Sequence, residues 1–114
     1  MAESVVSLTY GTALYEVAKD LGKEEQILIE VKELAMLVKA YEEFAEFLNS
    51  PAIMPKEKKE AVKNIMQDAF SREMINFVYV LIDKGRTAQI RKIAKRYIRL
   101  YDEERGIAEG KVFS

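Results

Sequence analysis

The sequence has no cysteine, no histidine and no tryptophan, and only two prolines in 114 residues. Without cysteine the chain has no disulfide and no thiolate nucleophile. The sequence therefore does not indicate whether the protein resides in an oxidising or a reducing compartment. Without histidine it lacks the usual general base near neutral pH and the commonest imidazole metal ligand. The familiar zinc sites and the Glu-x-x-His metal pairs of helical bundles are therefore excluded.

Phosphate-binding loops are missing as well. The five glycines are scattered, and none belongs to a GxxxxGK or GxGxxG motif. Glu42 and Glu46 have the spacing of one helix face, but a carboxylate pair on an exposed short helix is usually solvated surface. We therefore predict no metal, no cofactor and no enzymatic activity.

The chain also has little net charge and no long apolar run. A net charge of -1 creates no field that would attract nucleic acid or anionic lipid. No apolar run approaches the ~20 residues of a spanning helix, and the start MAESVVS lacks the order of a signal peptide. With 49% apolar and 32% charged residues, we expect one soluble domain without direct membrane insertion.

What the sequence does contain is helical periodicity. Apolar residues recur at spacings of three and four, and they predict six helices. The predicted apolar stripes, in chain order, span residues 6–21, 27–38, 41–48, 61–70, 74–82 and 90–101. The first stripe includes Val17 and Leu21. Short connections between the helices predict an all-α fold, a compact antiparallel six-helix bundle.

Residues suited to helix ends flank these stripes. Polar caps are expected at the starts of the first, fifth and sixth helices, at Ser4, Ser71 and Thr87. Pro55 suits the first position of the fourth helix. Glycines are expected to end the first, fifth and sixth helices, at Gly22, Gly85 and Gly106.

The last residues, GIAEGKVFS, lose the helical period, and Val112 and Phe113 favour a strand. We expect residues 1–105 to form a six-helix N-terminal domain. Residues 106–114 would be a linker and the first strand of a truncated C-terminal region. A terminal extension that packs on the bundle is the alternative.

Five basic residues share the outer face of the sixth helix: Arg91, Lys92, Lys95, Arg96 and Arg99. Acidic residues follow at 102–104, and no aromatic residue is interleaved to stack a base. We favour a solvated face over a nucleic-acid site, with an acidic protein partner as a weaker alternative.

The stretch NFVYVLIDKGR, residues 76–86, has more apolar residues than one buried face needs. Four residues of this region can fill the core: Met74, Val78, Leu81 and Ile82. Phe77 and Val80, next to Asn76, point to another side. On the first helix, small residues stand beside large ones: Gly11 and Ala13 beside Tyr10 and Leu14. The pattern allows a groove for an amphipathic helix from another chain, or a fifth helix buried all round.

Three stretches resemble one known family. TYGTALYEVA at 9–18 is similar to its Tyr-Ala-x-Ala-Leu-Phe-Glu-x-Ala opening, and FLNSPAIMPKEKK at 47–59 to its Phe-Leu-x-(Ser/Asn)-Pro segment. The third, from Asn76 to the end, is similar to its Asn-Phe-Leu segment, Gly-Arg pair and last helix. The chain thus resembles the N-terminal domain of the delta subunit of bacterial F-type ATP synthases, whose mitochondrial counterpart is the oligomycin-sensitivity-conferring protein.

The resemblance implies a six-helix bundle followed by an α/β region. It implies a non-catalytic peripheral-stalk subunit of a proton- or sodium-driven ATP synthase, part of the stator at the cytoplasmic face of the bacterial membrane. The N-terminal domain would hold the N-terminal helix of an alpha subunit between its first and fifth helices. The positions that match the family's groove are Tyr10, Ala13, Leu14, Asn76, Phe77 and Val80. The absent C-terminal region would bind the b subunit of the stalk.

The sequence also departs from the family pattern. Gly11 stands where alanine is usual, and Tyr15 where phenylalanine is usual. Thr9 replaces a common arginine, which removes one polar contact at the rim of the groove. We expect Gly11 to weaken the first helix slightly or to widen the groove. The alternative function is a helical adaptor that binds an unrelated amphipathic peptide in the same groove.

Overall fold

The computed structural model describes residues 4–113, and it describes side chains for residues 4–106. Within this range the chain forms α-helices, one short 3-10 helix and no strand, which confirms the predicted all-α six-helix fold. The helices are α1 (Val5–Leu21), α2 (Glu24–Ala40), α3 (Glu42–Asn49), α4 (Pro55–Met66), α5 (Arg72–Lys84), η1 (Thr87–Gln89) and α6 (Ile90–Phe113).

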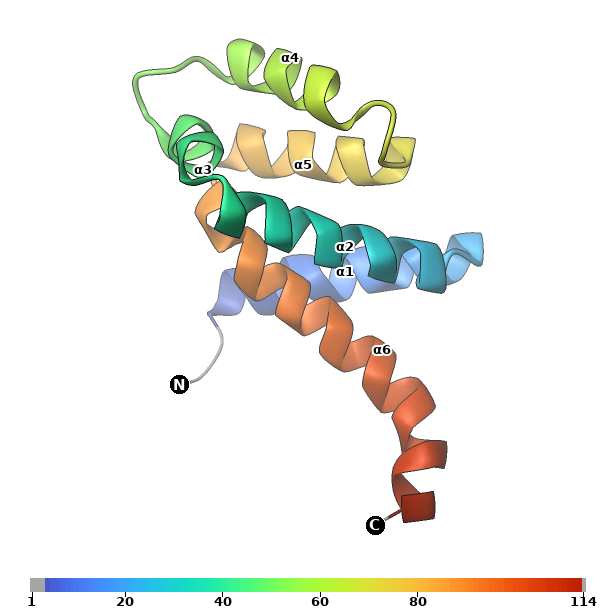
Figure 1. Ribbon diagram of the computed structural model, residues 1–114. Helices are drawn as coiled ribbons and strands as arrows, with labels where there is room; N and C mark the ends of the chain where they lie inside the picture. Colours follow the sequence, from blue (N-terminus) through green and yellow to red (C-terminus); the bar gives the residue numbers. More distant parts are fainter. Residues whose placement is uncertain (1–3, 114) are drawn as a thin grey trace.

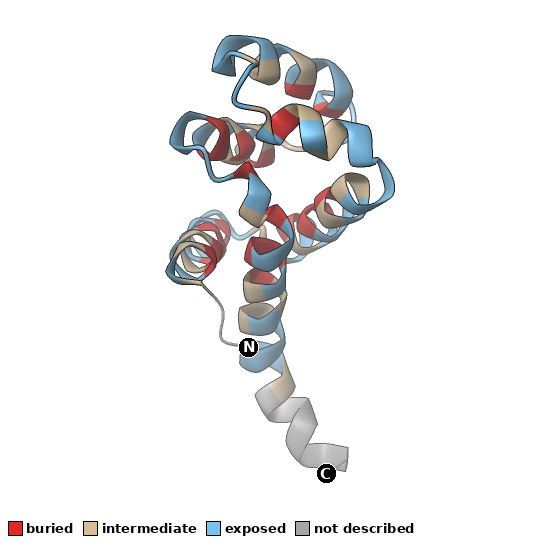
Figure 2. Ribbon diagram, turned by 90° about the vertical axis from the view of Figure 1, so that its left-hand side faces the viewer, coloured by how far each residue is buried: buried red, intermediate tan, exposed pale blue. Residues whose placement is uncertain are grey.

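The packing is organised around α6 and α5. Helices α1 and α2 both pack on α6, whereas α4 packs on α5 as an outer layer, and α3 lies against η1 (Figure 1). Buried residues lie on the inner faces of the helices (Figure 2). The predicted core residues of α5 are confirmed, since Met74, Val78, Leu81 and Ile82 are all buried.

Most of the predicted helix ends are confirmed. The Oγ of Ser4 accepts a hydrogen bond from the N–H of Ser7, and Pro55 is the first residue of α4. Gly22 and Gly85 both have a left-handed backbone, with φ of 68° and 67°. The N–H of Arg86 then bonds the carbonyl of Leu81 at 2.8 Å, which closes the end of α5 as glycine-ended helices commonly do.

Thr87 does not cap α6, contrary to the prediction. It opens η1, and α6 begins three residues later at Ile90. The Thr87 Oγ1 lies 3.0 Å from the carbonyl oxygen of Leu48 and 2.6 Å from Oδ1 of Asn49. The hydroxyl therefore serves the end of α3, whose last carbonyls lack helical partners, instead of the start of its own helix.

Helix α6 does not end at Gly106, and the strand expected from residue 107 onward is absent, since α6 continues to Phe113. Once a helix is formed, each further residue adds a hydrogen bond. Glycine inside a helix costs only about 1 kcal/mol against alanine, so Gly106 alone does not end α6. A strand needs a neighbouring strand, and the described chain offers none. The domain boundary near residue 105 stays a prediction.

The buried face of α1 differs from the predicted stripe. It consists of Ser7, Gly11, Leu14, Tyr15 and Ala18. Val17 and Leu21, predicted to belong to the stripe, are exposed. Gly11 faces α6, where an added Cβ would lie 2.5 Å from Cγ of Arg96. Gly11 therefore permits the close approach of α1 to α6, and the expectation that it widens the groove is wrong.

Candidate functional site

A hollow of about 190 Å³ lies between α1 and α5, and we call it the α1–α5 groove. Its lining residues are Ala13, Leu14, Val17, Glu73, Asn76, Phe77 and Val80. Five of the six residues that the sequence singled out line it. The sixth, Tyr10, lies beside the groove, with its ring edge-to-face with Phe77 at 6.4 Å between centroids.

The groove is open because its two walls have their main contacts elsewhere. Helix α1 packs chiefly on α6, and α5 packs chiefly on α4. The sides of α1 and α5 that face the groove therefore remain uncovered by other described helices. Leu14 is buried and forms part of the floor. Val17 and Val80 remain 46% and 43% exposed, which is much for apolar side chains in a hollow. The surface is thus apolar and concave, and no described residue of the chain covers it.

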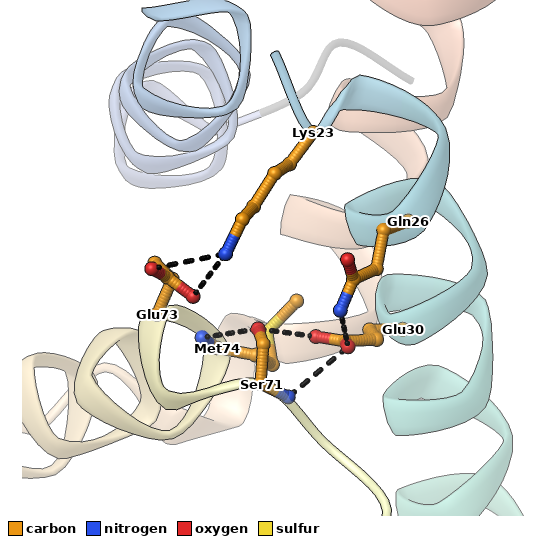
Figure 3. Close-up of polar contacts among 6 residues, drawn as sticks. All are labelled: Lys23, Gln26, Glu30, Ser71, Glu73 and Met74. Atoms are coloured by element: carbon orange, nitrogen blue, oxygen red, sulfur yellow. Dashed lines mark hydrogen bonds and ion pairs between the residues drawn. The ribbon is translucent and has the colours of Figure 1, made fainter. Parts of the chain in front are cut away.

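One charged residue, Glu73, lies at the groove. Each of its carboxylate oxygens is 3.3 Å from the Nζ of Lys23, at the start of α2 (Figure 3). The pKa of Glu73 is held below its usual 4.5, first by its own backbone N–H and then by Lys23. Near neutral pH the groove therefore has a negative charge beside its apolar wall.

The start of α5 is fixed to α2 by a buried carboxylate. Glu30 accepts hydrogen bonds from the N–H of Ser71 at 3.0 Å and from its hydroxyl at 2.7 Å (Figure 3). It also accepts one from the side-chain amide of Gln26 at 3.1 Å. Ser71 in turn caps α5 by accepting from the N–H of Met74. This network sets the position of Glu73 and of the residues one and two turns further along α5.

Sequence reasoning missed Val17 and Glu73. The spacing within the first helix assigned Val17 to the buried stripe. That assignment failed because the face of α1 that is buried depends on where α6 packs, which the spacing does not show. A signal for Glu73 was present, since it stands three, four and seven residues before Asn76, Phe77 and Val80 and so shares their face.

The other candidate sites are less organised. Glu42 and Glu46 are both exposed on α3. Among the residues that the structure describes, no group of three acidic side chains could hold a metal ion.

On the basic face of α6, the Nε of Arg96 donates to the hydroxyl of Thr12 at 3.2 Å, and Arg99 pairs with Glu103 at 3.6 Å. Within the described range, no helix has both the length and the apolar character to span a membrane.

Comparison with known proteins shows one consistent set of relatives. The family model of the ATP synthase delta (OSCP) subunit matches residues 6–114. The ATP synthase subunit delta of Alkaliphilus oremlandii is 39% identical over 102 residues, which are 90% of this chain and 56% of the relative. That of Acetivibrio thermocellus is 30% identical over 110 residues, 96% of this chain and 62% of the relative. The chain thus spans less than two thirds of the length of these relatives.

A solved structure shares the fold. A chain in a cryo-EM structure of the Polytomella F-ATP synthase, refined on its F1 head and rotor, superposes with a TM-score of 0.77. The match covers 89% of this chain and 90% of that chain. At 18% sequence identity, the likeness shows a common arrangement of helices.

Proposed function

The chain belongs to the ATP synthase delta (OSCP) subunit family, and on this basis we propose that it is a non-catalytic part of the stator of an F-type ATP synthase. In this proposal the α1–α5 groove receives the N-terminal helix of an alpha subunit. Binding of the b subunit of the peripheral stalk would fall to the part of the relatives' length that this sequence does not span. The assembly would lie at the cytoplasmic face of a bacterial membrane, driven by protons or sodium ions.

The observation that carries the proposal is the uncovered apolar lining of the α1–α5 groove. Val17 and Val80 lie on opposite walls, and each is exposed by more than two fifths. Apolar groups left in water cost about 25 cal/mol per Å² relative to a covered state. An amphipathic helix laid between the walls removes this area from water with its own apolar face.

Two polar residues at the groove favour one orientation of a bound helix. The side-chain amide of Asn76 is exposed, and it can both donate and accept a hydrogen bond at the edge of an apolar contact. Glu73 is ionised, and both of its carboxylate oxygens lie 3.3 Å from the Nζ of Lys23. We expect the bound helix to place a basic or amide side chain near Glu73, because a second carboxylate there would be repelled.

The decisive experiment is calorimetric titration of this chain with a synthetic peptide that copies the N-terminal helix of the alpha subunit from the same organism. We expect saturable one-to-one binding with a negative heat-capacity change, because apolar surface is buried. The Ala13→Asp variant should bind about tenfold more weakly or worse, because a carboxylate is desolvated in an apolar contact.

Ala52→Asp is the matched control, since Ala52 is an exposed alanine in the turn before α4 and lies outside the groove. It adds the same charge and should leave binding unchanged. Equal affinity of the parent and Ala13→Asp would place the peptide elsewhere. An unrelated amphipathic peptide that displaced the alpha peptide at lower concentration would favour the helical adaptor over the stator subunit.

A further inference from the structure

A second groove lies between α2 and α6, and it shares no lining residue with the α1–α5 groove. Its volume is about 260 Å³. Helix α2 contributes Lys32, Ala35, Met36 and Lys39. These positions are spaced three, four and seven residues from the first, so they share one face of the helix. We call this hollow the α2–α6 groove.

Helix α6 repeats the same pattern on the facing wall. It contributes Arg91, Ala94, Lys95 and Ile98, again at spacings of three, four and seven. The middle of the groove is apolar, because small alanines from both helices lie beside Met36 and Ile98. Met36 is 63% exposed, which is much for an apolar side chain. Methionine is flexible and is common at surfaces that bind other proteins.

All the charges that line the α2–α6 groove are positive. Lys32, Lys39, Arg91 and Lys95 are each exposed. None of these four side chains makes an ion pair with another residue of the described chain. The groove is therefore an apolar strip bordered by cations that have no ion-pair partner among residues 4–106.

The surface continues along α6. A neighbouring hollow shares Lys95 and Ile98 and ends at Asp102 and Glu103. From Arg91 to Glu103 the helix rises roughly 18 Å, which is about three turns. An elongated surface of this length fits a helical segment better than a small molecule.

We propose that the α2–α6 groove binds an acidic amphipathic helix of a partner protein. The partner's apolar face would cover Met36 and Ile98, and its flanking carboxylates would pair with the cations on both walls. A nucleic-acid backbone would use the cations but leave the apolar strip in water. A membrane surface is flat and does not enter a groove between two helices.

The two grooves then select different helices. The α1–α5 groove is lined by one charged residue, the acidic Glu73. The charged residues that line the α2–α6 groove are three lysines and one arginine. A helix with a basic residue for Glu73 is disfavoured beside the cations of the α2–α6 groove, and a helix with acidic flanks is disfavoured beside Glu73. The chain would thereby hold two different segments at once, and the second would bind even where the first is blocked.

The test uses this chain and a designed three-turn helical peptide with leucine on one face and glutamate on the flanks. We expect saturable shifts of the methyl resonances of Met36 and Ile98 in NMR titration, with little change at Val17 and Val80. The double variant Lys39→Glu/Lys95→Glu should weaken binding about tenfold, and added salt should weaken it in the parent.

The matched control is Lys56→Glu/Lys63→Glu, which changes the same charges at exposed sites on α4 and should bind as the parent does. A peptide with serine in place of leucine should lose most of its affinity. The proposal is overturned if that peptide, duplex DNA or phosphatidylserine vesicles bind as tightly as the designed helix. Absence of saturable binding, or equal weakening by the control variant, also overturns it.

Discussion

Gly11 of α1 lies directly against Arg96 of α6. A Cβ atom on Gly11 would be 2.5 Å from Cγ and 2.6 Å from Cβ of Arg96, and 3.1 Å from the carbonyl oxygen of Ile93. Real side chains do not approach this closely, so the two helices can cross at this distance only with glycine at residue 11. The crossing in turn fixes which face of α1 looks toward the α1–α5 groove.

Gly11→Ala should lower the free energy of unfolding by about 1 kcal/mol, because overpacking outweighs the gain in helix propensity. Gly106→Ala is the control, since a Cβ there would meet nothing within 4 Å and the backbone is helical. It should raise the free energy of unfolding by up to about 1 kcal/mol. Urea denaturation measures both, and stabilisation by Gly11→Ala would contradict the close crossing.

Glu30→Ala should cost about 2–3 kcal/mol of stability, because two donors of Ser71 and one of Gln26 lose a buried acceptor. Ser71→Ala should cost about 1 kcal/mol through loss of the α5 cap. Since the two residues bond each other, the double variant should lose less than the sum. Chemical denaturation of the four proteins checks this, and strict additivity would refute the coupling.

Thr87→Val should cost about 1–2 kcal/mol, because a buried hydroxyl that bonds the end of α3 is replaced by a methyl group. Thr87→Ser retains the oxygen and should lose less than the valine variant does. Thermal unfolding compares them. A valine variant as stable as the parent would show that the hydrogen bond from Thr87 to the end of α3 contributes nothing to stability.

Stability should fall as the pH is lowered below about 4.5. The pKa of Glu104 is held below its usual 4.5, first by the hydrogen bond from Lys19 and then by that from Tyr15. The pKa of Glu73 is also lowered. In acid the unfolded chain therefore binds more protons than the folded chain, so the stability from these carboxylates is present at neutral pH and lost on acidification.

Glu104→Gln should flatten this acid dependence in urea denaturation between neutral pH and acid. Glu60→Gln is the control, because Glu60 is exposed on α4 and has no ion pair with the rest of the described chain. It should leave the slope unchanged. The same slope for the parent and Glu104→Gln would exclude Glu104 from the effect.

Local sequence signals were sufficient for the helices and most of their ends. A serine before a stripe, a proline at its first position or a glycine after it acts within one turn of the backbone, independently of distant residues. Ser4, Pro55, Ser71 and Gly85 therefore behave as predicted. The core face of α5 was equally clear, because Met74, Val78 and Leu81 recur at helical spacing, with Ile82 beside them.

Long-range packing settled the rest. Whether Tyr15 or Val17 is buried depends on the side from which α6 meets α1, and no spacing within α1 contains that information. Thr87 turned from its own helix to the end of α3 because two segments almost forty residues apart meet there. The α1–α5 groove exists for the same reason. Its walls carry apolar residues that periodicity can locate, but the gap between them is left by helices that pack on other neighbours.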